Sequence, residues 1–309
     1  MKFFFAPLIF LIALTPVHAQ QLTYQTLYVD YDSAIEFRNL KIIPIRPKHP
    51  GFGEHAAQII TLNRALQEGL ATISERGTAS TENVHYMRIH NLSDKNIYVA
   101  SGEIFSGGRQ DRMVTRDTLL GPSEHDQYIS VMCVEEGRWS EKERKFQYEN
   151  FANPALRRVL DLDKNQVLIW QEISRQLDSQ QIKSKSLAYL AQVTNKKLES
   201  TQNEYLKFFH DKIKAADSTM VGIVCMSGDK VIGSDIFAGR NLFYNMVDPL
   251  LIGYCDQAIY AGKPVTISND EVRRYMDQLL TDEISQEKFL KDNGKIFRQH
   301  GEIIHINSY

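Results

Sequence analysis

A short run with two glycines and two arginines has the residue types needed to bind an anion. It extends from Ser106 to Arg112 and reads Ser-Gly-Gly-Arg-Gln-Asp-Arg. Adjacent glycines allow a sharp turn and a close backbone approach. Successive amides in such a turn can surround an anion, and planar guanidinium groups suit phosphate or carboxylate. The candidate ligand-binding residues are therefore Gly107, Gly108, Arg109, Gln110 and Arg112. An alternative stays open, in which the arginines of a strand connection pair with carboxylates such as Asp111 and Glu103.

A second polar run, Cys-Val-Glu-Glu-Gly-Arg-Trp, extends from Cys133 to Trp139. Arg138 and Trp139 can hold an anionic group or stack on a ring, so they join the candidate ligand-binding residues; the alternative is a tryptophan packed at a strand end. Glu135 is a candidate general base, although its neighbour Glu136 would face the opposite side of a strand.

Glu103 follows Gly102 in an apolar strand and is the other candidate catalytic carboxylate. A buried carboxylate must be paired or hydrogen-bonded, so structural pairing is favoured over a general base with a shifted pKa.

Several common sites are not supported by the sequence. The glycine spacing matches neither a phosphate-binding Walker loop nor a dinucleotide-binding loop. No Cys or His cluster has zinc spacing, so no metal is predicted, and no nucleophile elbow is present. The cofactor stays unknown. Cys133, Cys225 and Cys255 form an odd set, which we interpret as buried small hydrophobic residues rather than as a nucleophile or a Cys225–Cys255 bridge.

The first 19 residues have the composition of an export signal. Lys2 precedes the apolar run Phe3–Leu14, and Val17-His18-Ala19 ends it in a small residue. This pattern predicts a signal peptide cut after Ala19, hence a periplasmic or secreted protein. The run is too short for a transmembrane segment. Removing Lys2 leaves 35 basic and 38 acidic residues without a basic tract, so nucleic acid is not a predicted partner. The oligomeric state is left open.

The pattern of apolar residues predicts an α+β fold in a single domain, residues 20–309. Residues 20–139 should form an antiparallel β-rich sandwich or barrel core. Residues 140–216 should form a helical insertion, and residues 217–309 a C-terminal αβ segment. Specific expectations include a helix over Glu54–Gly69, one strand over Met113–Leu120 and a strand over Met220–Met226.

In the C-terminal segment, Ser268 with Glu271 three residues later predicts a capped helix. A helix should span Leu242–Tyr260, and a hairpin should join Lys295–Phe297 to Ile303–Ile306. Asp235 is expected to cap a helix rather than to take part in catalysis.

These motifs resemble the first type of the ADP-ribosylglycohydrolase- and rhodanese/phosphatase-associated protein domain, a domain of unknown function. The matching residues are Gly102-Glu103, Gly107 to Arg112, Cys133 to Trp139, Val221-Gly222, Gly228 and Asp235-Ile236-Phe237. The resemblance implies a link, by genomic association, to NAD-derived or ADP-ribosyl metabolism. This chain departs from that picture by carrying an export signal.

Three functional hypotheses follow. The first is a module in which Arg109, Arg112 and Arg138 bind a small anionic molecule that is phosphate-bearing or ADP-ribose-like. The second is a hydrolase or transferase that acts on a nucleotide-derived glycosidic or phosphate bond through Glu103 or Glu135. The third is a structural envelope protein in which the same motifs stabilise the fold.

Overall fold

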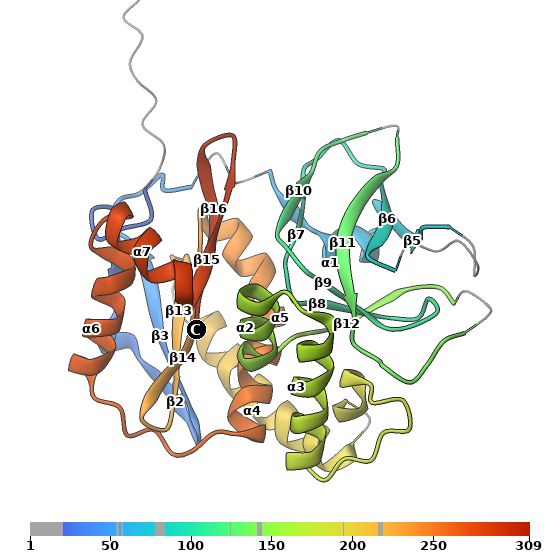
Figure 1. Cartoon of the computed structure of the whole chain (residues 1–309). Coiled ribbons are helices and arrows are strands. Elements are labelled where there is room, and N and C mark those ends of the chain that lie inside the picture. The colour runs from blue at the N-terminus through green and yellow to red at the C-terminus, as the bar shows by residue number, and fades with distance from the viewer. Residues whose placement is uncertain are drawn as a thin grey trace, which may run out of the picture.

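The computed structural model describes residues 21–53, 56, 58–77, 84–123, 125–140, 144–193, 195–215 and 219–309 (Figure 1). The predicted signal peptide lies outside the described residues, as does part of the helix expected over Glu54–Gly69. The described residues form an α+β structure with a β-rich core, which confirms the predicted fold class.

A seven-stranded sheet joins the two ends of the chain. Its strands, in spatial order, are β1 (Leu27–Val29), β3 (Leu40–Pro47), β13 (Gly222–Ser227), β14 (Lys230–Phe237), β16 (Glu302–Ser308) and β15 (Gly294–Gln299), with β2 (Ile35–Phe37) also paired to β3. All these pairings are antiparallel. N-terminal and C-terminal segments therefore build one sheet, and the predicted terminal hairpin is confirmed as β15–β16.

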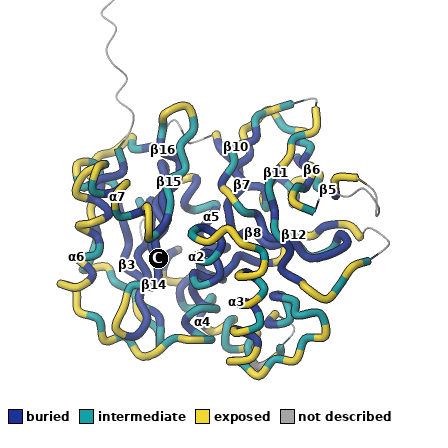
Figure 2. The backbone as a smooth tube through the Cα atoms, in the orientation of Figure 1, coloured by how far each residue is buried: buried dark blue, intermediate teal, exposed yellow. Residues whose placement is uncertain are grey.

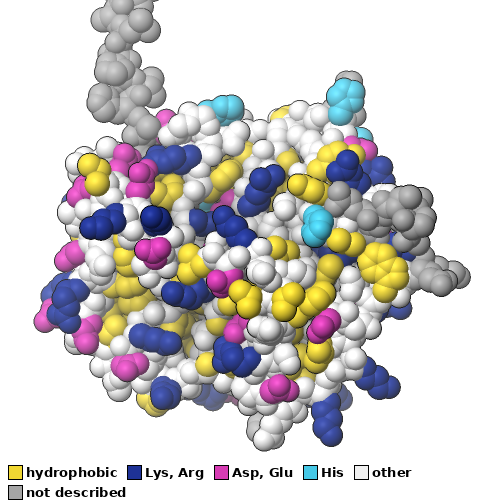
Figure 3. Space-filling model, viewed as in Figure 1, with side chains coloured by type: hydrophobic (Ala, Val, Ile, Leu, Met, Phe, Trp, Pro, Cys, Tyr) yellow, Lys and Arg dark blue, Asp and Glu magenta, His cyan; other side chains and the backbone are white. Residues whose placement is uncertain are grey.

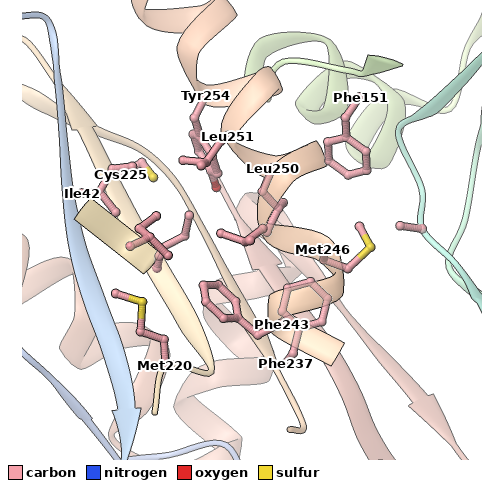
Figure 4. Close-up of a cluster of buried hydrophobic side chains, with 14 of the residues drawn as sticks. Ile42, Phe151, Met220, Cys225, Phe237, Phe243, Met246, Leu250, Leu251 and Tyr254 are labelled. Carbon is pink, nitrogen blue, oxygen red and sulfur yellow. The ribbon is translucent and has the colours of Figure 1, made fainter. Parts of the chain in front are cut away.

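Helices cover both faces of this sheet. Helices α4 (Lys196–Ala215) and α5 (Arg240–Tyr260) cover one face, and α6 (Asn269–Leu280) and α7 (Glu283–Asn293) the other (Figure 1). Along β13, Ile223 and Cys225 pack on the α5 side, where Figure 4 labels Cys225. Val224 and Met226 pack on the α6 side. A sheet buried on both faces needs continuous apolar strands, and β3, β13 and β14 are mostly dark blue in Figure 2.

The second β region contains two further sheets. One has the order β12 (Gln147–Phe151), β8 (Glu103–Ser106), β9 (Arg112–Val114), β11 (Gln127–Cys133), β6 (Tyr86–Asn91) and β5 (Ala71–Glu75). The other has the order β10 (Thr118–Leu120), β7 (Ile97–Val99) and β4 (Ile60–Thr61). They enclose a separate apolar core that includes Ile89, Val99 and Val131.

Three local predictions need correction. The strand expected over Met113–Leu120 is two strands, β9 and β10, because the chain leaves one sheet after Val114 and enters another. Helix α1 spans only Leu62–Gln67, because β4 occupies the preceding residues and Thr61 caps the helix. Helix α7 is absent from the predicted elements, since its buried face holds a glutamine, Gln286, as well as Leu290.

Helices α2 (Pro154–Asp163) and α3 (Gln166–Ser179) connect the two β regions. The Asn153 side chain accepts a hydrogen bond from the Leu156 amide and so caps α2. The apolar faces of α2 and α3 pack against Ile104 and Met113. Short 3₁₀ helices, η1 (Tyr31–Ser33) and η3 (Tyr189–Gln192), complete the named elements. Helix α2 also contacts α5, α7 and β15, so it lies at the junction of the sheets.

The three cysteines are free and buried, as predicted. The predicted capping box of α6 is present, with Ser268 and Glu271 bonded to each other's backbone. Within the described part of the chain, no helix is long and apolar enough to cross a membrane.

Candidate functional site

The turn at Gly107–Gly108 surrounds a carboxylate that belongs to the protein. The Arg109 amide donates a hydrogen bond of 2.5 Å to Oε1 of Glu75, on β5. Both glycines have positive φ, and a Cβ at Gly108 would lie 2.6 Å from that oxygen and 2.3 Å from the Phe146 ring. The double glycine therefore lets the chain pass closely around Glu75.

The arginines of the turn also reach this carboxylate. Arg109 Nε lies 3.1 Å from Glu75 Oε2, and Arg112 Nη2 lies 3.9 Å from Oε1. All three side chains are buried. Arg112 further donates to Cys133 Sγ at 2.5 Å and to Gln110 Oε1 at 3.2 Å. Glu75, 34 residues before Arg109 in the sequence, thus takes the position that the sequence analysis leaves for an external anion.

The second polar run joins the same region. Arg138 Nε donates to Glu135 Oε2 at 2.6 Å, and Arg138 Nη2 donates to Asp111 Oδ1 at 2.8 Å. Gln110 donates to the Glu135 backbone carbonyl at 2.9 Å. Burial and the nearby charge of Glu135 raise the pKa of Asp111 to about 6, although Arg138 opposes the rise. The structure therefore brings Arg109, Gln110, Arg112, Glu135 and Arg138 into one network of ion pairs and hydrogen bonds.

Two predicted site residues lie apart from this network. Trp139 is 47% exposed. Glu103 is fully buried on β8, and its carboxyl oxygens have no side-chain hydrogen-bond partner among the described residues. Burial raises the pKa of Glu103 well above its ordinary value, and the charge of Asp117 adds to the rise. A neutral carboxylic acid avoids the cost of an unpaired buried charge.

A second buried network lies where α2 meets the seven-stranded sheet. It contains three carboxylates, Asp117, Asp161 and Asp235, and three basic side chains, Arg157, Lys295 and His305. No sequence motif predicts these residues as a site. The available signal is a polar residue inside an apolar strand, such as His305 between Ile304 and Ile306.

Asp235 is central to the network, and its predicted role as a helix cap is wrong. It lies within β14, whereas Gly239 occupies the N-cap position of α5. Both terminal nitrogens of Arg157 donate to its carboxylate, at 2.6 and 3.0 Å, and the Tyr254 hydroxyl donates at 2.6 Å. Gly102 makes room for this arginine, since a Cβ there would lie 3.2 Å from Arg157 Cγ.

His305 connects two of the carboxylates. Its Nε2 lies 2.9 Å from Asp235 Oδ1, and its Nδ1 lies 2.9 Å from the Tyr98 hydroxyl, which donates to Asp117. Both ring nitrogens thus face groups that can accept a hydrogen bond, as the two N–H donors of an imidazolium require. Burial alone would lower the pKa of His305, but its hydrogen bonds to Asp117 and Asp235 raise it above the ordinary value.

Lys295 links this network to the surface. Its side chain is 23% exposed, and its Nζ lies 2.9 Å from Asp161 and 3.3 Å from Asp117. Burial opposes the charge, yet Asp117 and Asp161 raise the pKa of Lys295 above its ordinary value. Lys295 is therefore a permanent cation at the boundary between the buried network and solvent.

A basic groove of about 540 Å³ opens above Lys295. Its basic lining residues are Arg116, Lys164, Lys291, Lys295 and Arg298. They come from the β9–β10 connection, the end of α2, α7 and β15. Lys and Arg side chains gather on this face between α7 and α2 (Figure 3). The groove has the size of a small-molecule site. Among the described residues, no group of three or more acidic, histidine or cysteine side chains could hold a metal ion.

The fold and these buried networks define an α+β domain in which distant segments meet through ion pairs beneath a basic groove. The chain belongs to the ARG and Rhodanese-Phosphatase-superfamily-associated Protein domain family, whose model matches residues 28–306. This match confirms the resemblance drawn from the sequence motifs. Comparisons with curated proteins and with solved structures found no match.

Proposed function

We propose that the protein binds a small anionic molecule, of the phosphate-bearing class, in the basic groove. The observation that supports this proposal most directly is that five basic side chains line one groove. Three of them, Arg116, Lys164 and Lys291, are exposed and form no ion pair with another described residue. Cations gathered without partners repel one another, and a bound anion relieves that repulsion.

The ligand binds in the groove, in this proposal, rather than at the Gly107–Gly108 turn. At the turn, Glu75 already accepts from the backbone and pairs with the guanidinium groups of Arg109 and Arg112. An external anion there would have to displace a buried carboxylate from buried arginines, which costs several kcal/mol. The groove requires no such displacement at Arg116, Lys164 or Lys291.

Titration calorimetry of the full chain with inorganic pyrophosphate at low ionic strength tests the proposal. We expect binding that weakens as salt is added, because salt screens exposed charges. A triple variant, Arg116→Gln with Lys164→Gln and Lys291→Gln, should lose about tenfold or more in affinity. Lys288→Gln is the control, since Lys288 is exposed on α7, the helix that also carries Lys291, but does not line the groove. Equal affinity in the triple variant, or no binding by the wild type, would contradict the proposal.

We also propose that the protein is exported, on the composition of residues 1–19 alone. Lys2, the apolar run Phe3–Leu14 and the small residue Ala19 support this proposal. Cell fractionation with N-terminal sequencing tests it. Export predicts a chain that begins at Gln20 outside the cytoplasm, whereas intact Met1 in the cytoplasmic fraction would contradict it.

A further inference from the structure

The basic side chains of the groove differ in how much of their charge is already used. Lys295 pairs with Asp161 and Asp117, and Arg298 pairs with Glu287 at 3.2 Å. Arg116, Lys164 and Lys291 are the three lining cations that carry no ion pair within the described residues. A phosphate group would therefore be bound by these three, while Lys295 stays paired with Asp117 and Asp161.

Both lining carboxylates already have basic partners. Asp161 is the buried lining carboxylate: Lys295 and Ser101 donate to its Oδ1, and Tyr309 and Asn307 to its Oδ2. The other lining carboxylate, Glu287, is exposed and pairs with Arg298. A carboxylate with four donors has little capacity for a ligand hydroxyl. Asp161 therefore has little capacity to accept from the hydroxyls of a polyol, whereas Arg116, Lys164 and Lys291 suit phosphate oxygens.

Apolar side chains stand beside the cations. Each of three lining elements contributes one: Leu162 near Lys164, Leu290 next to Lys291, and Ile296 next to Lys295. Leu162 and Ile296 are partly exposed. The volume of about 540 Å³ exceeds the needs of a phosphate group alone. Apolar surface that a ligand covers contributes free energy in proportion to its area.

We infer that the groove takes a phosphate ester whose organic part is apolar, and that it discriminates against a polyol phosphate of equal charge. The inference rests on the proposed function, because it names the class of ligand for the same groove. The phosphate contacts Arg116, Lys164 and Lys291, and the organic part covers Leu162 and Ile296. The apolar part can be a flat ring or an alkyl chain, and the choice of probes separates these two sources.

Three probes of similar charge test the inference by calorimetry: phenyl phosphate, butyl phosphate and glycerol phosphate. We expect phenyl or butyl phosphate to bind about tenfold more tightly than glycerol phosphate. The tighter of the first two identifies a ring or a chain as the preferred organic part. Equal or tighter binding of glycerol phosphate would overturn the inference while leaving the proposed function intact. Failure of pyrophosphate to bind would instead overturn the proposed function.

Variants of the apolar residues provide an independent measurement. Leu162→Gln and Ile296→Gln should each reduce the advantage of the apolar ester over glycerol phosphate, with pyrophosphate affinity unchanged. Ile284→Gln is the matched control, because Ile284 is 83% exposed on α7 and does not line the groove. Melting temperatures identify any variant that fails to fold. If one of the two single variants does not fold, the other still provides the measurement. An undiminished advantage in a folded Leu162→Gln, Ile296→Gln double variant would overturn the inference.

Discussion

His305 Nε2 lies 2.9 Å from Asp235 Oδ1, although 70 residues separate the two in the sequence. Asp235 also accepts from both terminal nitrogens of Arg157, so its charge is shared between two basic groups. When His305 is protonated, the buried network contains three negative and three positive charges. Charge balance of this kind limits the cost of burying ions.

Replacing the histidine should therefore destabilise the fold. His305→Gln removes one cation and leaves Asp117 and Asp235 with less compensation. We expect a loss of about 3 kcal/mol in the free energy of unfolding, measured by urea denaturation. His125→Gln is the control, because His125 is exposed and should change stability by less than ~0.5 kcal/mol. A loss in His305→Gln no larger than in this control would rule out the imidazolium assignment.

The same groups predict how stability depends on pH. Arg157, Lys295 and His305 hold the pKa values of Asp117 and Asp235 below their ordinary values despite burial. The stability that Asp117 and Asp235 contribute is fully present above the unfolded pKa of about 3.9. It is lost as the pH falls from there through the lower pKa values of the folded state. His305 has a raised pKa, so its contribution is present below about 6.5 and is lost as the pH rises through the folded value.

Besides Glu103, two further acids with raised pKa values add to the alkaline loss. Asp111 has a pKa of about 6 and Asp256 of about 7, in both cases chiefly because of burial. Each stabilises the fold while protonated and loses this contribution as the pH rises above about 4. The urea midpoint should thus be highest in the acidic part of the range from about pH 4 to about pH 6.5. His305→Gln should flatten the decline above about pH 6.5, and an unaltered decline would contradict the assignment.

Arg112 and Arg116 offer a test of structural against ligand-binding arginines. Arg112 is 1% exposed and contacts Glu75 and Cys133, whereas Arg116 is exposed and lines the groove. Arg112→Ala should lower the unfolding free energy by about 3 to about 5 kcal/mol, because a buried carboxylate loses a partner. Arg116→Ala should leave stability within ~0.5 kcal/mol of wild type and weaken pyrophosphate binding. A stable Arg112→Ala variant that has lost ligand affinity would return the ligand site to the turn.

Glu103→Gln separates a neutral structural acid from a general base. Because burial raises the pKa of Glu103, its carboxyl group resembles the neutral amide that replaces it. We expect the variant to be as stable as wild type at neutral pH, within ~1 kcal/mol, and more stable at alkaline pH. Denaturation at two pH values provides the measurement. A loss of more than ~2 kcal/mol at neutral pH would indicate an ionised, paired carboxylate. The hydrolase hypothesis predicts, in addition, that any turnover is lost.

Local sequence patterns were sufficient to predict the types of elements and several local details. Alternating and continuous apolar runs predicted the strands that build the β-rich core, and the apolar run Leu242–Tyr260 predicted the helix α5. Local chemistry predicted the capping box at Ser268 and the sharp turn at Gly107–Gly108, because caps and turns depend on residues within a few positions. The buried state of the three thiols followed from the same preferences.

Which charged side chains form pairs depends on how distant segments pack. Glu75 reaches Arg109 across 34 residues, and Asp235 reaches Arg157 across 78. The groove likewise combines Arg116, Lys164 and Lys291 from three separate segments. Sequence spacing does not predict these pairs. The energy of a buried ion pair depends on the distance between the charges and on their desolvation, and both are set only when packing has brought the segments together. Two arginines beside a double glycine predicted a bound anionic ligand, whereas the packing of β5 against the turn places Glu75, a residue of the protein itself, beside these arginines.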